Sequence, residues 1–547
     1  MQHLPQQSNK KQTFLQGAFI LLLANMLVKV IGALFKIPLQ HLLLDEGMGV
    51  FNVAYQFYTA MFVISTAGVP VALSKMISES YTLGRNKEIR AIVRIAGLVF
   101  ITLGALCSAF LFFGADWLGS IIRNPAAVLS MKAVAPSVFF VACISVIRGY
   151  YQGKSNMMPT AMSQLVEALG KLFLGLGLAA FGMYRGMAVE ACTALAILGI
   201  TIGEGIAAVG IWAYYLRDPS RRLRAQSRES RTTGQLVHSL LWLVIPITLT
   251  NSVTSLTTLV DTTMVVSRLQ SIGYSLSEAN ELFGMYNGKA FTMYNLPQTL
   301  IAALAISIVP AIASAMAKHD KELTAKNLGS AMRIAMLIAL PAGTGYFVLS
   351  KPIISMLFKG DPEVGAACLR VLAFAIPFVA LVSLTNAVLQ AAGRVRVPVI
   401  SMLLGGVIKV LVNYTLVGTP QINIYGAPFG TLVCYAFITA VNLIILRKYV
   451  KLPALGKLFI RPMAACLGMG AGAYITYRAV SGLIGTLMSS REEAFVQMIS
   501  NAIGVILAIC VAAVLYIVLL LALRALEKDD IRMMPKGEKL VRLLRLK

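Results

Sequence analysis

Charged residues are scarce in this sequence, and acidic residues are the scarcest. Only 13% of the 547 residues are Asp, Glu, Lys or Arg, while 58% are apolar. Soluble globular domains carry about 25% charged residues, so this composition excludes an ordinary soluble protein. The sequence instead predicts a protein that crosses a membrane many times.

Cysteine and histidine are also few, and nucleotide-binding motifs are missing. The seven Cys stand singly in apolar segments, which excludes a disulfide framework and a thiolate metal site. The four His are too dispersed for a metal cluster, and no GxxxxGK[ST] loop is present to cradle a nucleotide phosphate. We therefore expect no enzyme activity and no bound cofactor. An ion gradient, of Na+ or H+, the membrane potential or the gradient of the substrate remains as the energy source.

Long apolar runs are what the chain has in quantity. About 20 apolar residues suffice to cross a bilayer, and hydropathy windows of about 19 residues predict roughly fourteen such spans. The predicted fold is an all-α polytopic membrane protein. Its spans lie near residues 13–34, 49–73, 89–113, 127–151, 157–182, 188–216, 236–267, 283–316, 328–350, 364–391, 396–417, 424–447, 459–480 and 496–524.

Basic residues outnumber acidic ones, 48 to 23. In a soluble protein such an excess would suggest a nucleic-acid partner, but here the basic residues sort by loop. With the amino end inside, roughly 33 of them fall on the cytoplasmic side and about nine outside, which is the bias that sets membrane orientation. We expect both termini to be cytoplasmic and no nucleic-acid partner.

Short motifs recur at matching places in the two halves of the chain. GVFN at 49–52 corresponds to GMYN at 284–287, and Gln152 precedes Lys171 at the same separation as Gln390 precedes Lys409. Unless the similarity is chance, this repeat predicts two pseudo-symmetric six-helix lobes, a plan that many transporters use. The predicted organisation is a first lobe at 1–216, a basic linker at 217–235, a second lobe at 236–447, two additional helices within 448–524 and a basic tail at 525–547.

Several Lys residues fall inside predicted spans. Lys289 and Asn287 lie in the eighth span, and an ammonium at that depth is costly unless it faces the bundle interior or a wet cavity. Lys36 can extend its ammonium to the membrane–water interface. Lys29 lies about 10 Å deeper, and the sequence leaves open whether it faces a cavity. Lys409 is either a second cavity cation or the partner of a carboxylate elsewhere.

Two acidic residues inside predicted spans have competing interpretations. Glu167 and Lys171 are four residues apart on one helical face, which favours a self-neutralising pair over a proton relay. Asp261 either takes part in cation or proton binding or pairs with Arg268. The excess of buried positive charge favours an anionic substrate, most simply a phosphate or diphosphate.

Four motifs carry a resemblance to a known family. They are KVIGALFKIPL at 29–39, the stretch GVFNVAYQFYTAMFVISTAGVPVALSKMISE at 49–79, RGYYQGKSNMMPTA at 148–161 and YNGKAF at 286–291. On these motifs the whole chain resembles the multidrug/oligosaccharidyl-lipid/polysaccharide (MOP) exporter superfamily, in the branch of stage V sporulation protein B and the MurJ-type lipid II flippases.

The resemblance implies a bacterial plasma-membrane flippase that works by alternating access on a polyprenyl-diphosphate-linked saccharide. Lipid II is the expected substrate; another lipid-linked glycan for capsule, teichoic acid or spore cortex is one alternative and a cation-coupled multidrug exporter another. The expected partners are this substrate, membrane lipids and the cell-wall synthesis machinery, and a monomer is expected.

The resemblance also assigns residues. The cavity arginines of the flippases fall at Lys29, Lys36 and Lys289, with Asn52 and Asn287 as further headgroup-binding candidates. The family's sodium site falls at Asp261, Asn413 and Thr431, but its second carboxylate position is Val417. The last two spans would form a groove for the polyprenyl tail. Glu167, Lys171 and Lys409 are secondary candidates.

Overall fold

The computed structural model describes residues 14–218, 231–298, 301, 312, 320–392, 394, 396–450, 455–487, 493–523 and 525. Every regular element in these ranges is helical, and ten helices among them are long and apolar enough to cross a membrane. The predicted all-α polytopic class is confirmed, whereas the count of fourteen is not. Most of the linker 217–235, much of the predicted span 283–316 and the tail from 526 lie outside the described residues.

The chain divides into two compact units. The first comprises residues 1–43 and 50–259, and the second comprises residues 44–49 and 260–547. The division therefore falls inside the long helix α9 (Thr233–Ser271) and not in the linker where the predicted lobes meet. The reason is packing: Leu236, Leu240 and Val244 of α9 share a hydrophobic core with Leu73 and Ile77 of the first unit.

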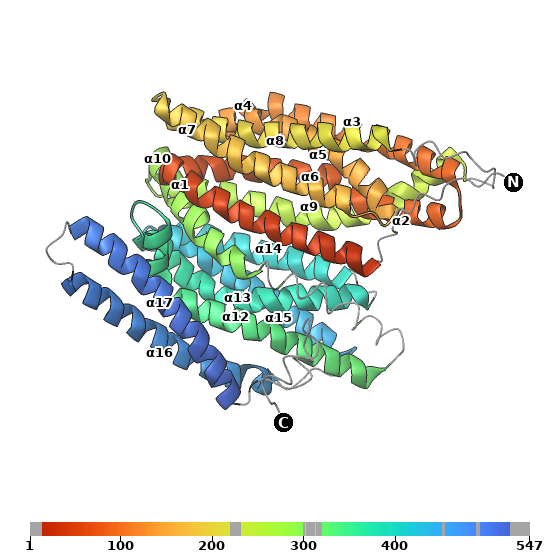
Figure 1. The fold of residues 1–547 in the computed structure, drawn as a ribbon. Helices are drawn as coiled ribbons and strands as arrows, with labels where there is room; N and C mark the ends of the chain where they lie inside the picture. The colour runs from red at the N-terminus through yellow and green to blue at the C-terminus, as the bar shows by residue number, and fades with distance from the viewer. Residues whose placement is uncertain are drawn as a thin grey trace. The chain divides into compact units, whose positions relative to one another are not determined.

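The helices of the first unit pack around α5 (Figure 1). Helix α5 lies against α2, α3 and α8, and α8 also covers α6, η2 and α7. The bounds are α1 (Phe14–Thr66), α2 (Val69–Thr82), α3 (Asn86–Phe113), α4 (Ala115–Ile121), η1 (Pro125–Ala127), α5 (Val128–Gly153), α6 (Met158–Gly170), η2 (Lys171–Gly175), α7 (Leu176–Tyr184) and α8 (Val189–Arg217).

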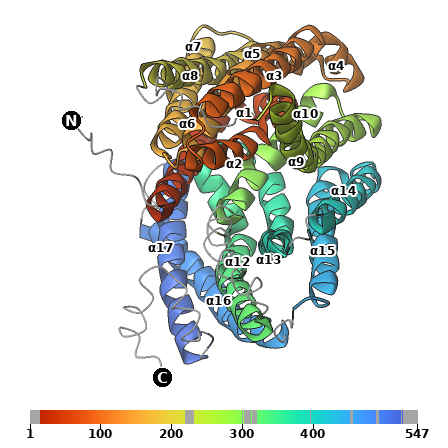
Figure 2. The ribbon, with the colours of Figure 1, turned by 90° about the vertical axis from the view of Figure 1, so that its right-hand side faces the viewer.

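The helices of the second unit pack around α13. Helix α13 lies against α12, α15 and η4, and α15 lies beside α14. Helices α16 and α17 run side by side and pack against α12 (Figure 2). The bounds are α10 (Leu276–Gly284), η4 (Met285–Ala290), α12 (Lys321–Leu357), α13 (Glu363–Ala391), α14 (Arg396–Val417), η5 (Asn423–Tyr425), α15 (Gly426–Leu446), α16 (Leu455–Leu487) and α17 (Glu493–Ala522).

The two units repeat one packing pattern. In the first unit α5 contacts α3 and α8, and α8 contacts α6; in the second, α13 contacts α12 and α15, and α15 contacts α14. When the six predicted spans of each half are numbered from one to six, the same contacts occur in both units: the third span packs against the fourth, the fourth against the sixth, and the fifth against the sixth. This is the packing expected of two pseudo-symmetric lobes, with α16 and α17 as the added pair.

Helix α1 contains the first predicted span and residues 49–66 of the second, separated by a sharp break. Leu44 has φ 58° and ψ −167°, a strained conformation for a residue with a Cβ. Residues 44–49, which follow the break, pack with the second unit although the rest of α1 belongs to the first. Gly49 and Gly284 make this packing close, since a Cβ on Gly49 would lie 2.0 Å from the carbonyl oxygen of Asn280.

Candidate functional site

Lys289 lies on η4, a π-helical turn, and its side chain is completely buried. Its ammonium donates to Asp45 Oδ2 at 2.8 Å and to the carbonyl oxygens of Lys359 at 2.9 Å and Asp361 at 3.2 Å. All three N–H groups thus have acceptors. Asp45 therefore neutralises this ammonium within the chain. A role of Lys289 in substrate binding stays a prediction.

The turn between α12 and α13 closes over this ion pair. Gly360, between the two carbonyls that accept from Lys289, has φ +81°, a conformation that favours glycine. A Cβ on Gly360 would also lie 3.3 Å from Asp45 Oδ2. The glycine therefore lets the backbone come close enough to complete the ammonium's hydrogen bonds.

Asp261 is the centre of a second buried cluster in the same unit. It is 5% exposed, and the ammonium of Lys409 lies 2.7 Å from its Oδ2. Asn413, one turn after Lys409 on α14, donates a hydrogen bond from Nδ2 to Asp261 Oδ1. Both oxygens of the carboxylate are therefore engaged, and of the two interpretations of Lys409 the partner of a distant carboxylate is confirmed.

Arg268, the alternative partner of Asp261, is occupied elsewhere. Its guanidinium lies 4.1 Å from the centre of the Tyr414 ring, and its Nε donates to the Tyr414 carbonyl oxygen at 3.2 Å. The Asp261–Arg268 pairing is therefore wrong. Arg268 stacks on an aromatic ring, which suits its planar guanidinium.

Thr431, the third residue of the predicted ion site, borders the Asp261 cluster. Its buried hydroxyl lies 3.4 Å from the hydroxyl of Tyr286 and donates to the Ala427 carbonyl oxygen at 3.5 Å. Its neighbour Gly430 touches Asn413, since a Cβ on Gly430 would lie 1.9 Å from Asn413 Oδ1. The structure thus joins Asp261 and Asn413 by a direct bond and places Thr431 beside them; an ion-coupling role stays a prediction.

In the first unit, Glu167 pairs with a residue that the local pattern did not indicate. Arg148 NH2 lies 2.6 Å from Glu167 Oε1, and Arg148 Nε donates to Ser163 Oγ at 2.9 Å. Glu167 and Ser163 are one turn apart on α6, so the fork of one guanidinium reaches both. The predicted Glu167–Lys171 pair is therefore wrong.

Lys171 instead lies among aromatic side chains. Its ammonium is 4.5 Å from the ring centre of Tyr55 and 5.0 Å from that of Phe35, and it donates to the Tyr55 hydroxyl at 3.2 Å. Within the described part of the chain, no carboxylate lies within ion-pairing distance of it. Phe35, whose ring lies under this ammonium, directly precedes Lys36 on α1. The first unit thus holds an ammonium group that rests on aromatic rings.

Glu204 is a buried carboxylate that the sequence reasoning missed. It lies on α8, is 7% exposed and accepts a hydrogen bond from the Tyr58 hydroxyl at 2.8 Å. The signal was available, because an acidic residue in a predicted span is a candidate by itself. Asp45 was missed for a different reason: it follows the first span and has the local pattern of a loop residue.

The remaining predicted headgroup residues are Lys29, Asn52 and Asn287. Lys29 is exposed on α1, while Asn52 and Asn287 are buried at 3% and 9% exposure. Asn52 belongs to the first unit and Asn287 to the second. A role of these three residues in binding a headgroup stays a prediction.

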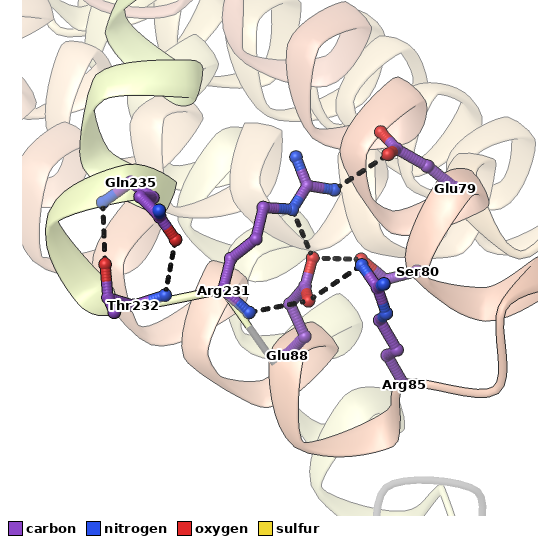
Figure 3. A network of polar contacts seen from close by, with 7 residues as sticks. All are labelled: Glu79, Ser80, Arg85, Glu88, Arg231, Thr232 and Gln235. Carbon is purple, nitrogen blue, oxygen red and sulfur yellow. Dashed lines mark hydrogen bonds and ion pairs between the residues drawn. The ribbon is translucent and has the colours of Figure 1, made fainter. Parts of the chain in front are cut away.

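A polar network fixes the start of α9 to α2 and α3 (Figure 3). Arg231 donates from Nε to Glu88 Oε1 at 2.9 Å and lies 3.0 Å from Glu79 Oε1. Glu88 is 1% exposed and also accepts from Ser80 at 2.9 Å. Arg85 NH1 lies farther from the same carboxylate, 3.7 Å from Glu88 Oε2. Because Glu88 is buried, Arg231 is the cation that makes its charge tolerable there.

Replacing Arg231 with Ala is expected to destabilise the first unit by about 3 kcal/mol, because the buried charge of Glu88 loses its main partner. Thermal unfolding of the purified chain in detergent would measure this. Arg85→Ala serves as the control and should cost less than about 1 kcal/mol. An Arg231→Ala/Glu88→Gln variant should regain part of the loss; no recovery would contradict the electrostatic explanation.

Comparison with known proteins identifies the family. A model of the polysaccharide biosynthesis protein family matches residues 14–316, more than half of the chain, and a MatE family model matches residues 286–415. Stage V sporulation protein B of Bacillus subtilis (strain 168) is 25% identical over 534 residues, covering 96% of this chain and 98% of that protein. Lipid II flippase MurJ of the same organism is 22% identical over 515 residues, covering 90% of this chain and 93% of that protein.

The fold agrees with this assignment. A solved structure of lipid II flippase MurJ in an inward closed conformation has a TM-score of 0.65 at 16% identity, and the match covers 91% of this chain and 98% of that chain. The chain therefore belongs to the polysaccharide biosynthesis protein family of the MOP superfamily and is a multi-pass membrane transport protein, not an enzyme.

Proposed function

We propose that this protein is a flippase for a lipid-linked saccharide and that its substrate is lipid II, carried across a bacterial plasma membrane by alternating access. The observation that carries the proposal is the ammonium of Lys171 in the first unit, which lies 5.0 Å from the ring centre of Phe35, the residue before Lys36. Lys171 rests on aromatic rings and a neutral hydroxyl. A cation in such surroundings attracts an anion such as a diphosphate.

The relatives support this choice of substrate. Both the curated relative MurJ and the MurJ structure are named lipid II flippases, and each is matched over at least 90% of this chain. We also propose that both termini lie in the cytoplasm, which the sorting of roughly 33 basic residues to one side supports. A monomer is part of the same proposal. Membrane lipids and the cell-wall synthesis machinery are the partners that this function requires.

One relative favours a second candidate of the same class. Stage V sporulation protein B is matched over 96% of this chain, which supports a lipid-linked glycan used in sporulation. Two buried carboxylates are neutralised within the chain, Asp261 by Lys409 and Glu167 by Arg148, so the multidrug exporter alternative would have to use Glu204, which is hydrogen-bonded to Tyr58. An exporter of organic cations needs a free negative charge in its site.

The test is lipid II flipping in proteoliposomes. Lys36→Gln and Lys171→Gln should each lower the rate about tenfold, the value of one charge-assisted hydrogen bond to a phosphate. Lys29→Gln tests the third predicted cation. Lys132→Gln is the control, because Lys132 pairs with the exposed Asp116 at 2.7 Å.

Melting curves must first show that each variant is folded. Flipping of lipid II at the native rate by a folded Lys36→Gln/Lys171→Gln variant would contradict the proposed role of the two ammonium groups. Transport of a different lipid-linked glycan, with lipid II left unmoved, would instead favour the second candidate.

A further inference from the structure

The family resemblance implies a sodium ion at Asp261, and the residues around Asp261 do not fit one. We propose that Lys409 is a tethered cation that occupies the place of the coupling ion, so that the native chain neither binds nor requires Na+ at this site. The proposal concerns ion binding alone and does not depend on the transported substrate.

The first argument is charge. The ammonium of Lys409 lies 2.7 Å from Asp261 Oδ2, and its side chain is 13% exposed against 7% for Asp261. The two charges form a nearly buried pair with no net charge. A free Na+ would have to enter beside the ammonium, and two cations at one carboxylate repel each other strongly where water is excluded.

The second argument is the set of oxygen ligands. Asp261 Oδ1 accepts from Asn413 Nδ2, so the amide presents a donor and not its oxygen to the carboxylate. The position of the family's second carboxylate is Val417, which is fully buried and supplies no ligand. In its present form the cluster therefore has one carboxylate, already neutralised, where the family's sodium site has two.

The third argument concerns what remains when the ammonium is removed. Asn413 is completely buried, and its Oδ1 has no hydrogen-bond partner among the described residues. This oxygen lies against Gly430, the residue before Thr431. Carboxylate and amide oxygens are ligands that hard cations take, so removing the ammonium would leave the Asp261 carboxylate and this oxygen for such a cation. In the native chain Lys409 supplies the positive charge instead.

The experiment compares the native chain with Lys409→Met, which keeps the length of the side chain but removes its charge. Both are purified in detergent, and their melting temperatures are measured in NaCl and in choline chloride at equal ionic strength. The native chain should melt at the same temperature in both salts. Lys409→Met should melt at least about 3 °C higher in NaCl, because Na+ now binds the folded state.

Two further variants serve as controls. Lys409→Met/Asp261→Asn removes both charges and should show no response to Na+, and Lys409→Arg keeps the tethered charge and should also show none. Radioactive 22Na+ should bind to Lys409→Met alone. If Lys409→Met is too unstable to purify in choline chloride, we expect that it can be purified as a folded protein in NaCl.

Three results would overturn the proposal. They are a sodium-dependent melting temperature or 22Na+ binding of the native chain, a folded Lys409→Met variant that ignores Na+, and a Lys409→Met variant that NaCl fails to rescue. None of these readouts involves lipid II, so they distinguish a failure of this inference from a failure of the proposed flippase function.

Discussion

Lys289→Met is expected to lower the free energy of unfolding by about 3–5 kcal/mol, because it removes the ammonium that lies 2.8 Å from the buried carboxylate of Asp45. Lys289 is 0% exposed and Asp45 is 7% exposed, so water cannot replace the lost ammonium. The carbonyl oxygens of Lys359 and Asp361 lose their donor as well. Thermal unfolding in detergent would show a large fall in melting temperature.

A double variant separates charge from packing. The Lys289→Met/Asp45→Asn variant removes both charges of this pair. Its loss of unfolding free energy should therefore be well below that of Lys289→Met alone. Lys351→Met is the matched control, because Lys351 pairs with Glu363 at half-exposed positions, where an ion pair contributes less than about 1 kcal/mol. Equal losses in Lys289→Met and Lys351→Met would contradict the assigned pairing.

The features that the sequence predicts well are those decided by residues close together in the chain. Apolar runs of about 20 residues identify spans without any knowledge of their neighbours. The positions at which charge enters these spans, such as Lys289, Lys409 and Asp261, are equally visible. The repeat can also be predicted from the sequence, since matching motifs predict matching helices. The packing around α5 and α13 agrees with it.

The partner of each buried charge could not be predicted in the same way. Lys289 pairs with Asp45, 244 residues away, and Asn413 bonds to Asp261 across 152 residues. Nothing in the local pattern indicates such partners. For Glu167 the local rule was misleading, because the free energy of an i, i+4 pair on a helix surface is only about 0.3–0.5 kcal/mol and a well-placed guanidinium from another helix outweighs it.

These pairings change the meaning of the charge excess. Among the candidate site residues named from the sequence, Lys outnumbers the acids in both halves, which favours an anionic substrate. In the second unit, however, Lys289 and Lys409 each have a carboxylate. The first unit differs: its Lys171 lies on the aromatic rings of Tyr55 and Phe35. A phosphate-binding role is therefore supported better in the first unit than in the second.

Gly284→Ala is expected to be among the most damaging single substitutions in the second unit. A Cβ at this position would lie 1.8 Å from the carbonyl oxygen of Asp45 and 2.7 Å from its carbonyl carbon. Backbone atoms cannot turn aside as the end of a side chain can, so residues 44–49 must move away from α10. Overpacking of this kind costs about 3 kcal/mol or more, well above the small gain that Ala brings to a helix.

The displacement of residues 44–49 also carries Asp45 away from Lys289. The loss of unfolding free energy in the Gly284→Ala/Lys289→Met double variant should therefore be smaller than the sum of the two single losses, because each substitution disrupts the same ion pair. Gly345→Ala in α12 is the matched control, since nothing lies within 4 Å of its Cβ position, and it should be neutral or slightly stabilising. Full additivity in melting experiments on the double variant would show that the glycine contact and the ion pair act independently.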